Sequence, residues 1–189
     1  MKSKIMHAAS SIDALKSSGY KSTYNAIAEI VDNSIDANAK NILIIGEQLA
    51  SVTGNAKEKG IESFAFLDDG DGMDFDTLNS CLSIGVSNKK QKKGMGRFGV
   101  GLPQASTFVW VEVYSWQNGI DNCFMSYLDW DKIVNEDLND VEYPVKKDIP
   151  EKYKVYLNWK TTEGKQYDFN KSGTLVVWTK CTRVDHKKW

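Results

Sequence analysis

The sequence contains little cysteine, no long apolar run and no excess of charge of either sign. Its three cysteines, Cys81, Cys123 and Cys181, lie far apart, so their spacing excludes a zinc knuckle or a paired redox motif. No segment approaches the ~18 apolar residues that span a bilayer, and the N-terminus lacks the apolar core of a secretion signal. We therefore expect no membrane association, and a cytoplasmic location, or a nuclear one in a eukaryote.

The charge and composition are those of an ordinary globular domain. Lys and Arg total 24 and Asp and Glu total 25, which gives a net charge of -1. This balance excludes a whole-domain electrostatic grip on nucleic acid, but it does not exclude a local basic patch. Hydrophobic residues make up 41% and charged residues 26% of the 189 residues, which argues against disorder and favours one domain.

The apolar patterns predict helices and strands mixed at first and mostly strands later. We expect helices at residues 10–18, 22–38 and 75–84 and strands at 42–45 and 63–67. A glycine-rich, basic loop at 85–101 leads into a further short helix that ends near residue 106. Later strands are predicted at 108–116, 122–128, 153–159 and 174–179, with a surface excursion at 131–150. This order favours an α+β sandwich, with a mixed, mostly antiparallel sheet and helices on one face.

The helix predicted at 22–38 carries a polar face. Glu29, Asn33 and Asp36 are spaced i, i+4, i+7 and stack together, whereas Ile27, Val31 and Ile35 are expected on the core side. A carboxylate can take a proton from water, and an amide oxygen suits a hard cation such as Mg²⁺. A plain solvated face is the alternative.

An acidic turn follows the strand predicted at 63–67. It begins with Asp68-Asp69-Gly70-Asp71-Gly72-Met73, and its glycines let a ligand approach the backbone closely. A carboxylate here can accept a hydrogen bond from an exocyclic amine such as that of adenine. A calcium loop is excluded because its twelfth position must be Glu, and counting from Asp68 or Asp69 reaches Asn79 or Ser80. A simple acidic turn stays open.

Glycines and lysines dominate the loop at 85–101. Gly96, Gly99 and Gly101 free several backbone N–H groups to point inward, and a helix N-terminus after them favours an anion. The segment is neither a Walker loop, since no Gly-Lys-Ser/Thr follows, nor a Rossmann turn, since no strand directly precedes it. For the lysines at 89–93, a solvated charge run is the alternative.

Taken together and in this order, the motifs resemble those of the GHKL ATPase superfamily, which contains gyrase, ninety-kilodalton heat-shock chaperones, histidine kinases and MutL-type proteins. The stretch from Glu29 to Ala37 is similar to its N-box, and the turn that begins at Asp68 is similar to its adenine-reading box. The stretch from Gly96 to Gly101 is similar to the glycine box of the ATP lid, and Gly173-Thr174 to the last nucleotide motif. The residues of these motifs are most similar to those of the MORC branch and its bacterial relatives. The resemblance runs from Ser10 to Lys180.

The resemblance implies a role for each of these residues. Glu29 would be the general base that activates water, Asn33 would hold Mg²⁺ through its amide oxygen, and Asp36 would support the N-box or reach the nucleotide through water. Asp68 would bind the adenine amine, helped by Thr174 through an ordered water, and Gly72 would admit the base. Further contacts to the nucleotide would come from Gly70, Met73, Lys89, Gly96, Arg97, Phe98, Gly99, Val100 and Gly101.

A Bergerat-type two-layer sandwich is the fold that the resemblance implies for residues 1–189, with ATP and Mg²⁺ as cofactors. The function implied is an ATP-driven conformational switch that forms a nucleotide-dependent homodimer in the full-length protein and leaves room for DNA contact through other domains. Gyrase, MutL and MORC-like members add a second domain that supplies a lysine to the γ-phosphate. Because the chain stops at Trp189, we expect an N-terminal fragment that binds ATP or ADP but hydrolyses ATP slowly or not at all.

Two other functions stay open at this point. One is a nucleotide sensor that binds without hydrolysis. The other is a histidine-kinase-type catalytic domain, but such a domain follows a helical phosphoacceptor segment, and the stretch before residue 22 is too short for one.

Overall fold

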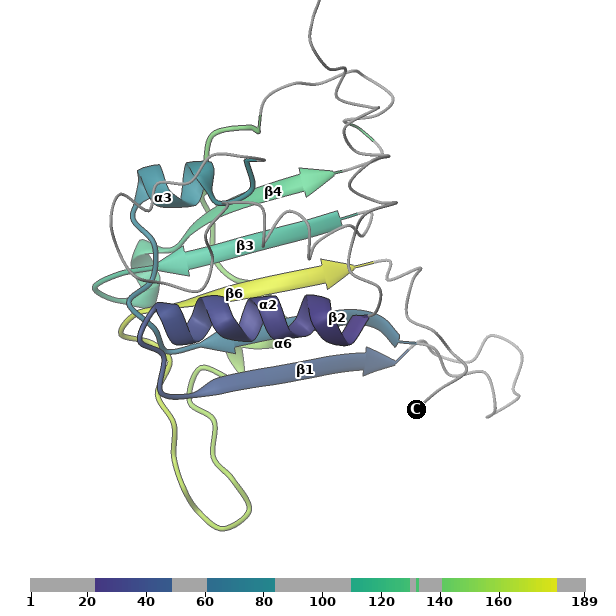
Figure 1. Ribbon diagram of the computed structural model, residues 1–189. Coiled ribbons are helices and arrows are strands. Elements are labelled where there is room, and N and C mark those ends of the chain that lie inside the picture. Colours follow the sequence, from purple (N-terminus) through teal and green to yellow (C-terminus); the bar gives the residue numbers. More distant parts are fainter. Residues whose placement is uncertain (1–22, 49–60, 84–109, 130–131, 133–140, 180–189) are drawn as a thin grey trace, which may run out of the picture.

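A six-stranded antiparallel sheet forms the centre of the computed structural model, which describes residues 23–48, 61–83, 110–129, 132 and 141–179. Its strands are β1 (Ile42–Gln48), β2 (Ile61–Asp68), β3 (Trp110–Trp116), β4 (Phe124–Asp129), β5 (Val145–Lys146) and β6 (Gly173–Thr179). Their order across the sheet is β1-β2-β6-β3-β4-β5. The last strand in sequence, β6, therefore lies in the middle (Figure 1) and joins the two halves of the sheet.

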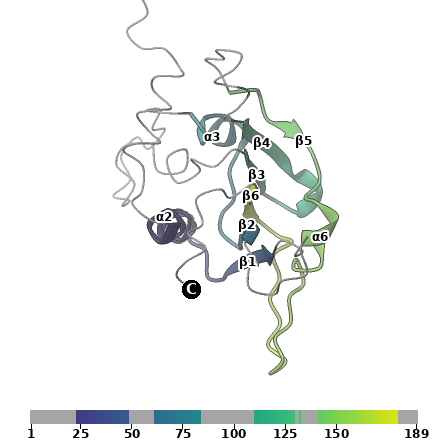
Figure 2. The same cartoon turned by 90° about the vertical axis from the view of Figure 1, so that its right-hand side faces the viewer.

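Within the described residues, two helices cover one face of this sheet. Helix α2 (Thr23–Asp36) lies over β2 and β6, and α3 (Phe75–Ser80) lies beside β4 (Figures 1 and 2). Alternate residues of the strands meet these helices, because successive side chains of a strand point to opposite faces. The resulting core contains Ala26, Ile30, Phe64, Phe66, Leu78, Val111, Val113, Leu128, Val176 and Trp178. The α+β sandwich predicted from the sequence is confirmed.

The segment between β5 and β6 covers the opposite face. It contains α6 (Glu151–Lys154) and buries Ile149, Tyr153, Leu157 and Phe169 against the sheet (Figure 2). The prediction of a strand at 153–159 is therefore wrong. Tyr153 and Leu157 are spaced i, i+4, so the alternation that favours a strand also fits a helical turn, and Pro150 caps its start.

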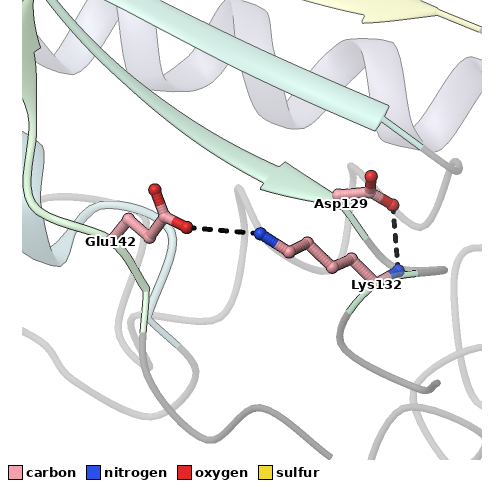
Figure 3. Close-up of polar contacts among 3 residues, drawn as sticks. All are labelled: Asp129, Lys132 and Glu142. Carbon is pink, nitrogen blue, oxygen red and sulfur yellow. Dashed lines mark hydrogen bonds and ion pairs between the residues drawn. The ribbon is translucent and has the colours of Figure 1, made fainter. Parts of the chain in front are cut away.

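The predicted surface excursion at 131–150 is only partly correct. Its second half adds β5 to the sheet edge and buries Ile149. At the first half, the backbone N–H of Lys132 donates to Asp129, and the Lys132 ammonium donates to Glu142 at 3.5 Å (Figure 3). Both charged side chains are well exposed, so this ion pair contributes at most about 1 kcal/mol.

Helix α2 buries a different stripe from the one predicted. Ala26, Ile30 and Ser34 are buried, whereas Ile35 is 52% exposed and Ile27 is only partly buried against the core. The prediction that Ile35 faces the core is wrong. The apolar pattern gave the wrong face because Ser34 counts as polar. Its hydroxyl is hydrogen-bonded to Asp68 and can therefore be buried.

Other predicted segments differ from the structure at their ends or lie outside the described residues. The helix expected at 75–84 ends at Ser80, although Leu82 is still buried in the same core. A 3-10 turn, η1 (Ile120–Asn122), stands where the strand expected at 122–128 was to begin. The predictions at 10–18, 85–101 and on to residue 106 lie outside the described residues. Within the described part, no helix is long and apolar enough to cross a membrane.

Candidate functional site

Three polar side chains form a row across the middle of the sheet. Asp68 ends β2 and pairs with Thr174 near the start of β6, and Thr174 pairs in turn with Ser115 on β3. Directly paired residues of antiparallel strands point to the same face, and this face is the one that α2 covers. All three side chains are buried. A row of buried polar groups in an otherwise apolar core marks a candidate binding site.

Asp68 is held by three donors. Its Oδ1 accepts from the backbone N–H of Gly70 at 2.9 Å and of Thr174 at 3.2 Å, and its Oδ2 accepts from the Ser34 hydroxyl at 2.8 Å. Burial raises the pKa of Asp68 above its ordinary value, even though these hydrogen bonds act in the opposite direction. A buried carboxylate with a perturbed pKa is typical of a functional site.

The carboxylate of Asp68 can accept one more hydrogen bond. An ionised carboxylate offers roughly four lone-pair positions, and the described residues donate two bonds to Oδ1 but only one to Oδ2. Among the described residues, the partners of Asp68 are hydrogen-bond donors, and no lysine or arginine forms an ion pair with it. A ligand that donates an N–H to Oδ2 would complete this set, and an aromatic amine is such a donor.

Ser34 attaches helix α2 to the site. It is 4% exposed, and its hydrogen bond to Asp68 connects α2 with the end of β2. The sequence interpretation assigned no role to Ser34. The signal that could have identified it is its spacing, since Ser34 continues the i, i+4 stripe of Ala26 and Ile30 and is the single polar member of it.

Asp69 and Asp71 hold the acidic turn to the loop between α2 and β1. Asp69 accepts hydrogen bonds from the backbone of Lys40 and from both the backbone and side chain of Asn41. Burial alone would raise the pKa of Asp69, but these hydrogen bonds lower it below its ordinary value. Asp71 accepts from the Asn38 side chain at 2.6 Å. Both carboxylates that flank Gly70 therefore have structural partners in this loop and, unlike the buried Asp68, stay within reach of solvent.

Two glycines are required where backbones approach each other. A Cβ on Gly72, whose φ is +69°, would lie 2.2 Å from the carbonyl oxygen of Trp116. A Cβ on Gly173 would lie 2.1 Å from the carbonyl oxygen of Asp68. Both glycines thus allow neighbouring strand ends to meet around Asp68 and Thr174. The packing of the protein itself therefore requires glycine at these positions, which the sequence analysis had explained by ligand binding alone.

Replacing Gly173 by alanine is expected to destabilise the fold by about 2 kcal/mol or more, because the added methyl group must push β6 away from β2. Gly46→Ala is a matched control, since Gly46 also lies in a strand and its nearest atom to an added Cβ is 3.7 Å away. Urea unfolding of both variants measures the effect. Equal stabilities would contradict the proposed close approach at Gly173.

The predicted polar face of α2 is only partly accessible to solvent. Glu29 and Asn33 are half-buried and Asp36 is exposed. Among the described residues, no group of three His, Cys, Asp or Glu side chains could hold a metal ion. A cation at Asn33 would therefore need oxygen ligands from elsewhere, such as phosphate groups and water, which is usual for Mg²⁺.

The remaining predicted site residues divide into two groups. Met73 lies in the turn, where its backbone N–H donates to the Ser115 hydroxyl at 2.8 Å and its side chain packs on the helix-covered core. Lys89, Gly96, Arg97, Phe98, Gly99, Val100 and Gly101 lie outside the described residues. Ser115, like Ser34, was not identified from the sequence, because a single serine in the apolar strand pattern of β3 carries no distinguishing signal.

Comparisons with known proteins agree with this geometry. Residues 20–165 match the family model described as histidine kinase-, DNA gyrase B- and HSP90-like ATPase. Protein MICRORCHIDIA 3 of Arabidopsis thaliana is 35% identical over 78 residues, which cover 41% of this chain and 12% of that protein. ATPase MORC2 of Homo sapiens is 26% identical over 180 residues, which cover 82% of this chain and 17% of that protein.

The matched regions occupy less than a fifth of the length of these curated relatives. The family model, by contrast, covers most of this chain and includes α2, the acidic turn and the sheet strands β1 to β5. The resemblance to MORC proteins that the motifs indicated is confirmed. The chain belongs to the family of histidine kinase-, DNA gyrase B- and HSP90-like ATPases.

Proposed function

We propose that this chain binds ATP with Mg²⁺ and hydrolyses ATP, and that it serves as an ATP-driven conformational switch in the full-length protein. The observation that carries the proposal is the buried Asp68 carboxylate, which is paired with Thr174 across two strands and whose Oδ2 accepts only one hydrogen bond from the described residues. Membership of the ATPase family supports the same ligand class.

Adenine recognition follows from the acceptors in the row. The exocyclic amine of adenine has two N–H donors, and the open position on Asp68 Oδ2 can accept one of them. Gly70 and Thr174 hold Oδ1 from the other side, so the carboxylate cannot rotate away when the ligand leaves. This preorganisation means that little side-chain ordering is needed when the base binds.

Hydrolysis is proposed to depend on α2. Glu29 is the general base, which takes a proton from the attacking water, and Asn33 is the Mg²⁺ ligand on the same helix. Mg²⁺ would supply charge neutralisation at the phosphates, where Asn33 contributes its amide oxygen. Gly96 to Gly101 and Lys89 are proposed to contact the β- and γ-phosphates, and this part rests on the sequence motif alone.

The Ser34–Asp68 bond supports a switch that includes α2. Because Ser34 lies on the helix that carries Glu29, a shift of α2 would disturb the hydrogen bonds of the base-reading carboxylate. Nucleotide binding would thus favour one position of the helix over another. We propose that this position promotes a homodimer of the full-length protein, as the family resemblance implies.

Calorimetric titration of the chain with ATP, ADP and Mg²⁺ tests the proposal. We expect both nucleotides to bind, and ATP to bind more tightly when Mg²⁺ is present. Phosphate release measured on the full-length protein then separates an ATPase from a sensor that binds without turnover. A folded sample that binds neither nucleotide would overturn the proposal.

A further inference from the structure

Ser115 is the third member of the polar row and makes three contacts. It is 1% exposed. Its Oγ accepts from the backbone N–H of Met73 at 2.8 Å, donates to the carbonyl oxygen of Gly173 at 3.0 Å, and lies 3.1 Å from the hydroxyl oxygen of Thr174. A single buried hydroxyl therefore joins the acidic turn, the start of β6 and the candidate ligand-binding threonine.

The Ser115 hydroxyl has only one proton to share among its three contacts, and this favours one direction for its hydrogen bond with Thr174. A serine hydroxyl has one proton and two lone pairs. The proton is used on Gly173 and one lone pair accepts from Met73, so only a lone pair is left for Thr174. All three contacts are hydrogen bonds at the same time only in this arrangement, in which the Thr174 proton points at Ser115. The remaining lone pairs of Thr174 are left for other partners, and Thr174 becomes an acceptor there.

We propose that Ser115 is a positioning residue that holds the Thr174 hydroxyl as an acceptor toward the base, and so increases selectivity for purines with an amine at C6. The proposal rests on the ATP binding proposed above. Asp68 and Thr174 then both present acceptors, which fit an amine directly or through one water. A carbonyl oxygen at C6, as in inosine triphosphate, meets two acceptors and no donor.

Removing the Ser115 hydroxyl should relax this discrimination. In Ser115→Ala, the Thr174 proton loses its partner and can turn toward the ligand, where it can donate to a C6 carbonyl. We expect the ratio of ATP affinity to inosine triphosphate affinity to fall about three- to tenfold, the range of one hydrogen bond. Competition of each nucleotide against a labelled ATP measures both affinities on the same sample.

Ser126→Ala is the matched control. Ser126 lies on the neighbouring strand β4, is also 1% exposed, and its Oγ has no hydrogen-bond partner among the described residues. It loses the same hydroxyl from the same sheet without altering the row. We expect the affinity ratio of Ser126→Ala to equal that of the wild-type chain.

A double-mutant cycle separates positioning from general weakening. Thr174→Val removes the hydroxyl that Ser115 is proposed to orient, so adding Ser115→Ala to Thr174→Val should leave the ratio unchanged. A purely structural role for Ser115 would lower both affinities equally and leave the ratio of the single variant unchanged. Ser115→Cys, which keeps a similar volume and a weakly bonding thiol, covers the case in which Ser115→Ala does not fold.

The outcomes distinguish this inference from the proposed function. If the wild-type chain prefers ATP and the ratio is unchanged in Ser115→Ala or Ser115→Cys, the role of Ser115 is wrong and the proposed function stands. If the wild-type chain binds neither nucleotide, the proposed function fails and the inference fails with it. A ratio that falls in the single variant but not on the Thr174→Val background supports the inference.

Discussion

Replacing Asp68 by asparagine is expected to weaken ATP binding about 100-fold or more while the chain stays folded. The amide oxygen of the new side chain can still accept from Gly70 and Thr174. The Ser34 hydroxyl, which donates to Oδ2 in the wild-type chain, can donate to the carbonyl oxygen of Ile30 instead. The amide NH₂ group then takes the place of Oδ2 and points a donor at the adenine amine, which is itself a donor. Calorimetric titration with ATP measures the loss, and circular dichroism verifies the fold.

Asp69→Asn is the control for Asp68→Asn. Asp69 is the adjacent carboxylate, but its partners are Lys40 and Asn41 in the protein itself. We expect Asp69→Asn to lower the free energy of unfolding with little change in ATP affinity. If the two variants lost ATP affinity to the same extent, Asp68 would have no special role in reading the base.

The second large effect is expected at Glu29. Glu29→Gln in the full-length protein should reduce the rate of ATP hydrolysis by about 10²- to 10⁴-fold, because the amide cannot take a proton from water. ATP affinity should stay within about threefold, since the general base acts in the transition state and not in binding the nucleotide. Phosphate release under saturating ATP gives the rate, and titration gives the affinity.

Glu112→Gln is a suitable control for this substitution. Glu112 is also a partly buried glutamate, but it lies on β3, where its carboxylate accepts from the Tyr114 hydroxyl at 2.8 Å. It should leave the hydrolysis rate close to that of the wild-type protein. Normal turnover in Glu29→Gln would remove Glu29 from the mechanism, whereas loss of both affinity and turnover would indicate a role in binding.

Local patterns in the sequence predicted most elements of the fold. The helix at Thr23–Asp36 and the strands at Ile42–Gln48, Ile61–Asp68 and Gly173–Thr179 each lie within a few residues of their predicted bounds. Periodicity and glycine positions reveal such elements because they act over a single turn or strand. The strand predicted at 153–159 failed because its apolar spacing fits two periods, and burial against the sheet selected the helical one.

The sequence identified those residues of the candidate site that belong to a motif of consecutive residues. Asp68 stands in an unbroken acidic turn, and Thr174 follows a glycine at a strand start, so both could be identified. Ser34 and Ser115 could not, since each is an isolated serine in an apolar pattern. These two serines join the polar row only in the folded protein, because strand pairing places Ser115 beside Thr174 and helix packing brings Ser34 into contact with Asp68.

The sequence by itself indicated the family, most of the helices and strands, and the residues that are proposed to bind a nucleotide. Only the tertiary structure decided which of the carboxylates in the acidic turn is buried beside Thr174. Asp69 and Asp71 are hydrogen-bonded to the loop after α2 and stay within reach of solvent. Asp68 is instead buried between α2 and β6, where Ser34 and Thr174 donate to it. The reason is physical: the burial and the hydrogen bonds of Asp68 depend on Ser34 and Thr174, which lie far away along the chain, and the folded arrangement alone brings them together.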